Sequence, residues 1–168
     1  QKIVGISGLD TRALTLQIRD AGAMRAGIFS GSAIASEAEM LAKVTAAPEM
    51  KGRKLSDEVT TPEVYQIAAK GHKKGRVAIL DLGIKRSTLE HLSERGLDIS
   101  VYPANVSSET LLGGSPDAVF FSNGPGDPQA SEQQVNLLRD VLKSKTPFFG
   151  ICFGNQPVSY THLTLPTK

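Results

Sequence analysis

The single cysteine of the chain, Cys152, stands between two glycines in the run Gly150-Ile-Cys-Phe-Gly154. The pattern G-x-C-x-G is the thiol counterpart of the strained strand-to-helix elbow that presents a nucleophile above a sheet. Neighbouring segments press close to such an elbow, so a Cβ atom at Gly150 or Gly154 would collide with them. The N–H of Phe153 would then be free to hold a developing oxyanion. The pattern predicts a nucleophile at Cys152, and the alternative is a small buried side chain at a strand end.

A second unusual segment is Ser122-Asn-Gly-Pro-Gly-Asp-Pro128. Its two glycines and two prolines favour a rigid, tightly turned loop. Backbone N–H groups of this loop can approach a ligand closely because Gly124 and Gly126 carry no side chains. The alternative is an ordinary turn that ends a strand. If the loop lies beside the elbow, it offers a second donor for an oxyanion.

Both segments follow short apolar runs that predict strands. Four parallel strands are expected, near residues 77–82, 98–102, 118–121 and 147–151. Apolar residues at helical spacing predict helices between them, over residues 84–95, 107–112 and 131–142. Short, almost wholly apolar strands that alternate with helices are typical of a parallel sheet covered on both faces. Such sheets place their chemistry at the carboxyl ends of the strands, where Cys152 and the 122–128 loop are expected.

The first sixty residues show a different pattern, which predicts short strands and capped helices of a smaller α+β domain. A helix is expected over residues 11–21 with Asp10 as its N-cap, and Ser36 begins a capping box for a second helix. Short strand patterns occur at residues 3–6 and 25–30. Periodicity then weakens toward a basic run that ends at Arg76.

The expected organisation therefore has four segments. They are an N-terminal domain part at 1–60, a linker at 61–75, the first part of the sheet domain at 76–156, and a tail outside that domain at 157–168. The tail is set apart because no helical periodicity is visible after Val158. Pro157 also falls where a helix should open, and a helix tolerates proline only in its first turn.

The composition of the chain excludes several kinds of partner and site. The chain has 168 residues, enough for one ordinary domain or two small ones. With 40% apolar and 21% charged residues it can form a packed core. A net charge of +2 is too small to indicate nucleic acid or an anionic membrane as the main partner. One cysteine allows no intramolecular disulfide and no cysteine-rich metal site, which fits a reducing, cytoplasmic compartment.

Taken together, the 122–128 loop and the run from Gly150 to Gln156 resemble the class I glutamine amidotransferases. Further residues resemble one branch of that family, the glutamine-hydrolysing small subunits of carbamoyl-phosphate synthases. These residues are Gly8-Leu-Asp-Thr-Arg12, Leu80-Asp-Leu-Gly-Ile-Lys-Arg86 and Pro103-Ala104. The resemblance covers about residues 1–156, and the opening Gln1 suggests a piece of a longer chain. It implies that residues 1–60 are the C-terminal part of the N-terminal domain of such a subunit, and residues 76–156 the N-terminal part of its amidotransferase domain.

The resemblance implies a flavodoxin-like sheet and a reaction on L-glutamine. Cys152 would attack the amide carbon to give a thioester and release ammonia, and water would then free glutamate. The backbone at Gly124 and Phe153 would form the oxyanion hole. Residues Gly124, Gly126, Phe153 and Gln156 would contact glutamine.

The resemblance also implies a partner. Ammonia would pass to a large subunit that makes carbamoyl phosphate for arginine and pyrimidine biosynthesis. ATP and Mg²⁺ would be used by that large subunit, and this subunit would need no cofactor or metal. No nucleic acid and no membrane is expected as a partner.

A nucleophile of this family needs a histidine base oriented by a glutamate, and both come from a segment well beyond the elbow. Only twelve residues follow Gln156, and His72, His91 and His162 are not expected to serve as that base. We therefore expect this chain by itself to be inactive.

Other functions stay open at this point. One is a non-catalytic binding module on a flavodoxin-like sheet, in which Cys152 would be unreactive. A second is another class I glutaminase, such as that of anthranilate or GMP synthase, although these normally lack a preceding segment of this kind. A cysteine peptidase with a similar elbow would leave the 122–128 loop without an evident purpose.

Overall fold

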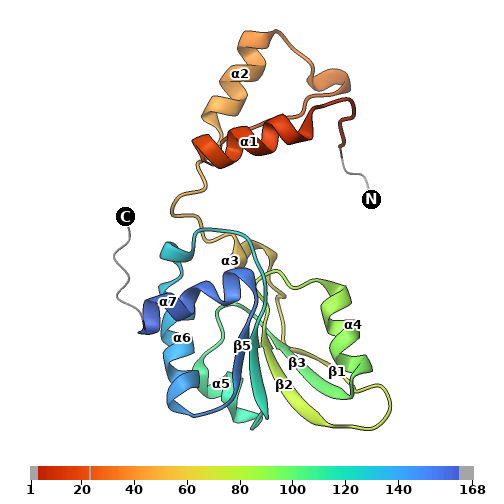
Figure 1. Cartoon of the computed structure of the whole chain (residues 1–168), viewed down its shortest axis with the longest axis vertical. Helices are drawn as coiled ribbons and strands as arrows, with labels where there is room; N and C mark the ends of the chain where they lie inside the picture. The colour runs from red at the N-terminus through yellow and green to blue at the C-terminus, as the bar shows by residue number, and fades with distance from the viewer. Residues whose placement is uncertain (1–3, 23, 163–168) are drawn as a thin grey trace. The chain divides into compact units, whose positions relative to one another are not determined.

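A computed structural model describes residues 4–22 and 24–162, and the chain divides into two compact units at Lys51 and Gly52. The first unit holds helix α1 (Thr11–Ala21), the short 3₁₀ helix η1 (Gly31–Ala33) and helix α2 (Glu37–Ala46) (Figure 1). Both predicted helices are confirmed.

The N-terminal caps of these two helices are also as predicted. Asp10 Oδ1 accepts a hydrogen bond of 2.9 Å from the N–H of Ala13. The side chains and backbone of Ser36 and Glu39 form a reciprocal capping box. These bonds satisfy N–H groups that the first turn of a helix leaves without an intrahelical partner.

The described residues of the first unit form helices and no strand, which differs from the expected α+β arrangement. Residues 25–30 lack a neighbouring strand there, and an extended segment without a partner gains no ladder of hydrogen bonds. Residue 3 of the other strand pattern lies outside the described residues. No residue of α1 or α2 is buried.

The second unit is built on a five-stranded sheet in the order β1-β3-β2-β4-β5 (Figure 1). The four predicted strands are confirmed and pair in parallel, as β2 (Gly75–Leu80), β3 (Leu97–Tyr102), β4 (Ala118–Phe121) and β5 (Phe148–Gly150). The carboxyl ends of these strands therefore meet at one edge, as the sequence predicts.

The fifth strand, β1 (Tyr65–Ile67), was not predicted and lies inside the segment interpreted as a linker, 61–75. It pairs antiparallel with β3, so that Tyr65 is opposite Val101. Two of its three residues are exposed because β1 is at the edge of the sheet. An edge strand of this length needs no run of apolar residues, so its sequence carries little signal.

Helices cover the sheet on both sides (Figure 1). Helix α4 (Arg86–Glu94) packs through Leu89 on one face, against residues such as Ile79 and Val101. Helices α5 (Ser108–Gly113) and α6 (Glu132–Lys143) lie on the other face, in a cluster that includes Leu80 and Phe121. The remaining helices are the short α3 (Ser56–Val59), η2 (Pro128–Ala130), η3 (Cys152–Gly154) and α7 (Gln156–His162).

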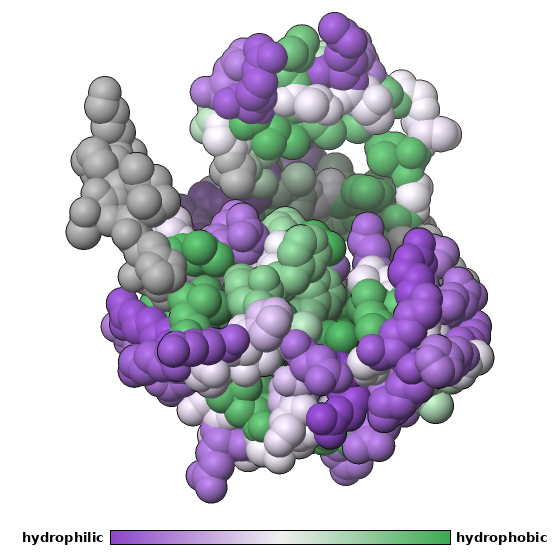
Figure 2. All heavy atoms as spheres, turned by 60° about the horizontal axis from the view of Figure 1, so that its bottom comes forward, coloured by the Kyte–Doolittle hydropathy of each residue, from purple (hydrophilic) through white to green (hydrophobic). Residues whose placement is uncertain are grey.

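Strand β5 is an edge of the sheet, and apolar side chains are exposed there. The exposed fraction is 63% for Phe149 and 41% for Ile151. The Phe149 ring nevertheless stacks on Phe120, with 5.8 Å between the ring centroids. Figure 2 shows apolar residues gathered in the middle of one face of the molecule, flanked by hydrophilic ones.

Asp98 ties the segment before β2 to strand β3. Its carboxylate accepts a hydrogen bond of 2.9 Å from the N–H of Ala69 and forms an ion pair with Lys73. The side chain of Lys73, followed by the Ala69 N–H, lowers the pKa of Asp98. A carboxyl group whose pKa is lower in the folded state adds stability above its unfolded pKa, and this contribution is lost as the pH falls through the folded pKa.

We therefore expect Asp98→Asn to lower the free energy of unfolding near neutral pH. The difference between the variant and the unchanged chain should shrink in acid, because Asp98 is then protonated in both folded and unfolded chains. Urea unfolding at a series of pH values measures this. If the difference in the free energy of unfolding stayed constant as the pH falls, the ionised Asp98 carboxylate would not be the source of the stability.

Candidate functional site

Cys152 lies on a strained turn directly after β5. Its backbone φ angle is +53°, a left-handed conformation that residues other than glycine rarely adopt. The N–H of the preceding Ile151 donates to the carbonyl oxygen of Phe121 at 3.1 Å, which continues the pairing of β5 with β4 up to the turn. The thiol is exposed. The elbow predicted from G-x-C-x-G is therefore confirmed, and it presents the thiol to solvent.

Both glycines of the motif are required by close backbone contacts. A Cβ atom at Gly150 would lie 2.5 Å from the carbonyl oxygen of Gly154 and 2.9 Å from the nitrogen of Asn155. A Cβ atom at Gly154 would overlap the carbonyl oxygen of Phe121 and lie 2.6 Å from that of Ser122. The predicted collisions are confirmed, and the second one shows that the elbow rests on the end of β4.

The change Gly154→Ala is accordingly expected to destabilise the second unit by about 1–3 kcal/mol or more, because backbone atoms cannot move aside as a flexible side chain would. Urea unfolding measures the effect. Gly113→Ala is the matched control, since nothing lies within 4 Å of a Cβ atom there. Equal stability of the Gly154→Ala variant and the unchanged chain would contradict the packing described.

The 122–128 loop is held at its beginning by bonds to the residues after β2. The N–H of Leu82 donates to Ser122 Oγ at 2.9 Å, and the Asn123 side chain donates to the carbonyl oxygen of Gly83 at 3.0 Å. Gly124 lies so close to the backbone of Leu82 that a Cβ atom would overlap the Leu82 carbonyl oxygen. The loop therefore needs glycine at this position for steric reasons.

The elbow and the loop lie side by side at the carboxyl edge of the sheet. Phe121 of β4 pairs with Gly150 of β5, so the loop and the elbow start from the same level of the sheet. Among the described residues, the N–H groups of Gly124 and Phe153 have no hydrogen-bond acceptor. An exposed thiol on an elbow that packs against the start of this loop is suited to attack on a carbonyl, and these two N–H groups are the candidate donors for the oxyanion.

The other predicted site residues occupy the same region. The side chain of Phe153 is only 2% exposed and belongs to the core, so Phe153 has only its backbone available for a ligand. Gly126 has a φ angle of +115° and lies in the loop. Gln156 is exposed at the first residue of α7. Pro157 follows it within the first turn, where a helix tolerates proline.

Residues 52–61 are part of this region and were not predicted to be. They belong to the second unit, and Thr61 donates its N–H to the buried carboxylate of Asp81 at 2.8 Å. The same carboxylate accepts the N–H groups of Gly83 and Ile84, each at 2.9 Å. This segment therefore packs at the carboxyl ends of β2 and β4. Its contacts join residues far apart in the sequence, and no local pattern indicates them.

The three histidines of the chain all belong to the second unit, and each is on a different segment from Cys152. His72 precedes β2, and its carbonyl oxygen adjoins Gly96 at the start of β3, so it is at the amino edge of the sheet. His91 is on α4, where its Nδ1 is 3.3 Å from a carboxylate oxygen of Glu94. His162 is the last residue of α7. Neither His72 nor His91 is placed to act on the thiol.

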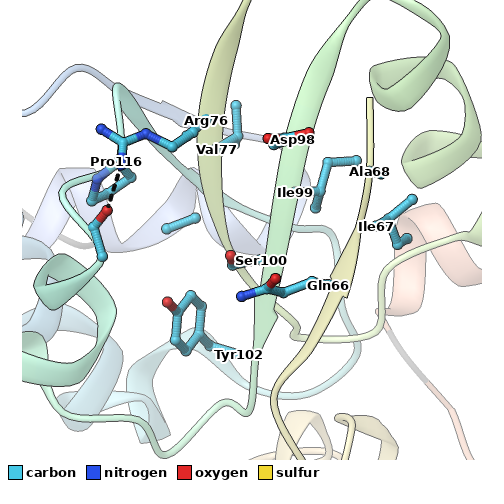
Figure 3. Close-up of a pocket in the computed structure, with 12 residues that line it drawn as sticks. Gln66, Ile67, Ala68, Arg76, Val77, Asp98, Ile99, Ser100, Tyr102 and Pro116 are labelled. Carbon is cyan, nitrogen blue, oxygen red and sulfur yellow. Dashed lines mark hydrogen bonds between the residues drawn. The ribbon is translucent and has the colours of Figure 1, made fainter. Parts of the chain in front are cut away.

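A hollow of about 470 Å³ lies over β1, β2 and β3, away from the elbow. Figure 3 shows Gln66, Ser100 and Tyr102 around it, with Arg76 on the opposite wall bonded to the carbonyl oxygen of Gly114 at 3.1 Å. None of the predicted site residues lines it. Within residues 4–22 and 24–162, no three His, Cys, Asp or Glu side chains are grouped so as to hold a metal ion.

Comparison with protein families agrees with this arrangement. The family model for glutamine amidotransferase class-I matches residues 78–162, which include the loop and the elbow. The chain belongs to this family. The match also extends beyond Gln156, where the sequence analysis placed the end of the resemblance.

The chain is also similar to curated relatives that are named carbamoyl phosphate synthase small chain. It is 55% identical to the Streptomyces avermitilis protein over 156 residues, which are 93% of this chain and 41% of that protein. Identity to the Streptomyces coelicolor protein is 53% with the same coverage. For Bifidobacterium longum it is 46%, over 92% of this chain and 41% of the relative. The chain thus spans about two fifths of the length of these relatives.

No helix in the described part of this family member is long and apolar enough to cross a membrane.

Proposed function

We propose that this chain provides the nucleophile of a carbamoyl-phosphate synthase small subunit, which hydrolyses L-glutamine to supply ammonia. One observation carries the proposal: the exposed thiol of Cys152 is on a strained elbow that packs, through Gly154, against Phe121 and Ser122 at the start of the 122–128 loop. The names of the relatives favour this synthase over the anthranilate and GMP synthase alternatives.

We infer the following reaction at this site. Cys152 Sγ, having lost its proton to a base, attacks the amide carbon of glutamine, and the carbonyl oxygen becomes an oxyanion. The N–H groups of Gly124 and Phe153 are the donors for that oxyanion. The intermediate collapses to a thioester, and the amide nitrogen takes a proton and leaves as ammonia. Water then attacks the thioester, which releases glutamate and returns the thiol.

Gly126 and Gln156 complete the proposed glutamine site. Gly126 has a backbone conformation that favours glycine, so the loop can turn closely around a ligand. Gln156 offers an exposed amide at the start of α7. A primary amide both donates and accepts hydrogen bonds, and it therefore matches the α-amino and carboxylate groups or the amide of the substrate.

The proposed partner is the large subunit of the same synthase, which would use the ammonia together with ATP and Mg²⁺ to form carbamoyl phosphate. This chain would contribute neither the nucleotide site nor a metal site. The small-chain names of the relatives support a complex of two kinds of subunit.

A hybrid protein tests the proposal. In this hybrid, the chain replaces the aligned 41% of the Streptomyces avermitilis small chain, to which it is 55% identical. Glutamate release from glutamine by the hybrid, measured with the natural S. avermitilis protein as a positive control, is expected to be within about tenfold of that control. A folded hybrid without glutamine hydrolysis would contradict the proposal.

A further inference from the structure

The end of the 122–128 loop that precedes α6 is fixed by residues 52–53, which are far from it in the sequence. The Asp127 carboxylate accepts the N–H of Gly52 at 2.8 Å, and the N–H of Asp127 donates to the carbonyl oxygen of Arg53 at 3.0 Å. Two bonds in opposite directions therefore join Asp127 to residues 52–53, and one Asp residue supplies both.

Packing at Gly126 supports the same contact. A Cβ atom at Gly126 would lie 2.9 Å from the carbonyl oxygen of Arg53 and 3.1 Å from the nitrogen of Leu55. The two backbones are thus in direct contact. The carbonyl oxygen of Asp127 also accepts bonds from the Ala130 N–H at 3.0 Å and from Ser131 Oγ at 3.3 Å, which link it to the start of α6.

Residues 52–61 are themselves anchored on the sheet, so they offer a fixed support. Thr60 Oγ1 donates to the carbonyl oxygen of Asp81 at 2.7 Å and accepts the N–H of Ala104 at 2.9 Å. It therefore bridges the carboxyl ends of β2 and β3. Ser56, in the middle of the segment, is only 1% exposed.

The loop is consequently fixed at both ends. Ser122 and Asn123 hold its beginning through the residues after β2. Asp127 holds its other end. Between them lies Gly124-Pro125-Gly126, in which Gly124 packs against the backbone of Leu82 and Gly126 against that of residues 53–55. The position of the Gly124 N–H therefore depends on the contacts that hold both ends of the loop.

We propose that Asp127 is a positioning residue, which uses residues 52–53 to hold the 122–128 loop so that the Gly124 N–H faces the oxyanion. The inference rests on the function proposed above. It predicts an effect on the rate of the chemical step more than on glutamine binding, because the oxyanion exists only after attack by the thiol.

The test compares three variants of the hybrid. Asp127→Ala should lower kcat for glutamine hydrolysis about 10- to 100-fold, as expected for a donor displaced from its place, while KM changes less than about threefold. Asp127→Asn keeps a side-chain oxygen that can accept the Gly52 N–H, and it should stay within about threefold of the unchanged hybrid.

Asp117→Ala is the matched control. The Asp117 carboxylate accepts the N–H of Arg76 at 2.7 Å, before β4 and at the opposite edge of the sheet. The control removes a bond of the same type and should leave kcat within about twofold. An Asp127→Ala hybrid with the kcat of the unchanged hybrid would overturn the inference, as would an equal loss of kcat in Asp117→Ala.

Hydrogen exchange separates this inference from the proposed function. In the 168-residue chain, Asp127→Ala should speed amide exchange in residues 122–127 at least about tenfold, and Asp117→Ala should not. Unchanged exchange in Asp127→Ala would overturn the positioning role whatever the activity. If a Cys152→Ala hybrid were fully active, the proposed function would fail, and the exchange result alone would decide whether Asp127 fixes the loop.

Discussion

In the hybrid small chain combined with its large subunit, Cys152→Ser is expected to lower glutamine-dependent carbamoyl phosphate synthesis by about four orders of magnitude or more. Synthesis from added ammonia should stay within about twofold of the unchanged complex, because ammonia bypasses the thioester. The elbow should keep its shape, because serine differs from cysteine by one atom and can adopt the same backbone conformation, with a φ angle of +53°.

The rates of carbamoyl phosphate synthesis from glutamine and from ammonia are measured on the same preparation. Ammonia-dependent synthesis shows that the complex is assembled, and a thermal melt shows that the variant is folded. If glutamine-dependent synthesis persisted in a Cys152→Ser preparation free of the unchanged protein, Cys152 would not be the nucleophile.

The second large effect concerns the 168-residue chain by itself. We propose that none of its histidines is the base that takes the proton of the thiol. We therefore expect its glutamate release to be lower than that of the hybrid by about three orders of magnitude or more, the size of effect that follows the loss of a triad partner. His72 is at the amino edge of the sheet and His91 is on α4, so neither is placed to take the proton of the thiol.

Glutamate release by the chain is compared with that of the hybrid at equal concentration. The alanine variants of His72, His91 and His162 are the controls, and none of these substitutions should lower the residual rate. A rate close to that of the hybrid would show that a base exists within the 168 residues, and the variant with the largest loss would then identify it.

The elements that the sequence predicts correctly are those whose physical signal is local. The parallel strands are continuous apolar runs, because both faces of such a sheet are buried. The elbow was predictable because Gly150 and Gly154 mark positions where any side chain would meet backbone atoms. The tightly turned loop was predictable from its two glycines and two prolines. The contact of Gly124 with the Leu82 backbone was not, because it joins residues far apart in the sequence.

The remaining features depend on contacts between distant residues. Strand β1 has three residues, and the alternation of Tyr65 and Ile67 with Gln66 is too short to predict a strand by itself, so β1 depends on its pairing with β3. The expected strand at 25–30 has a suitable local pattern and no neighbouring strand in its unit. Asp127 meets Gly52, which is 75 positions away, and no spacing rule links two such residues.

The central claim is that glutamine forms a thioester with Cys152, and one measurement tests it directly. The hybrid is mixed with glutamine labelled in its carbon chain, quenched in acid during turnover and mapped by peptide mass spectrometry. We predict that the label is on the peptide that contains Cys152, that hydroxylamine removes it, and that the Cys152→Ser variant carries no such thioester. Label on another residue, or full glutamate release after Cys152 has been completely alkylated, would contradict the account.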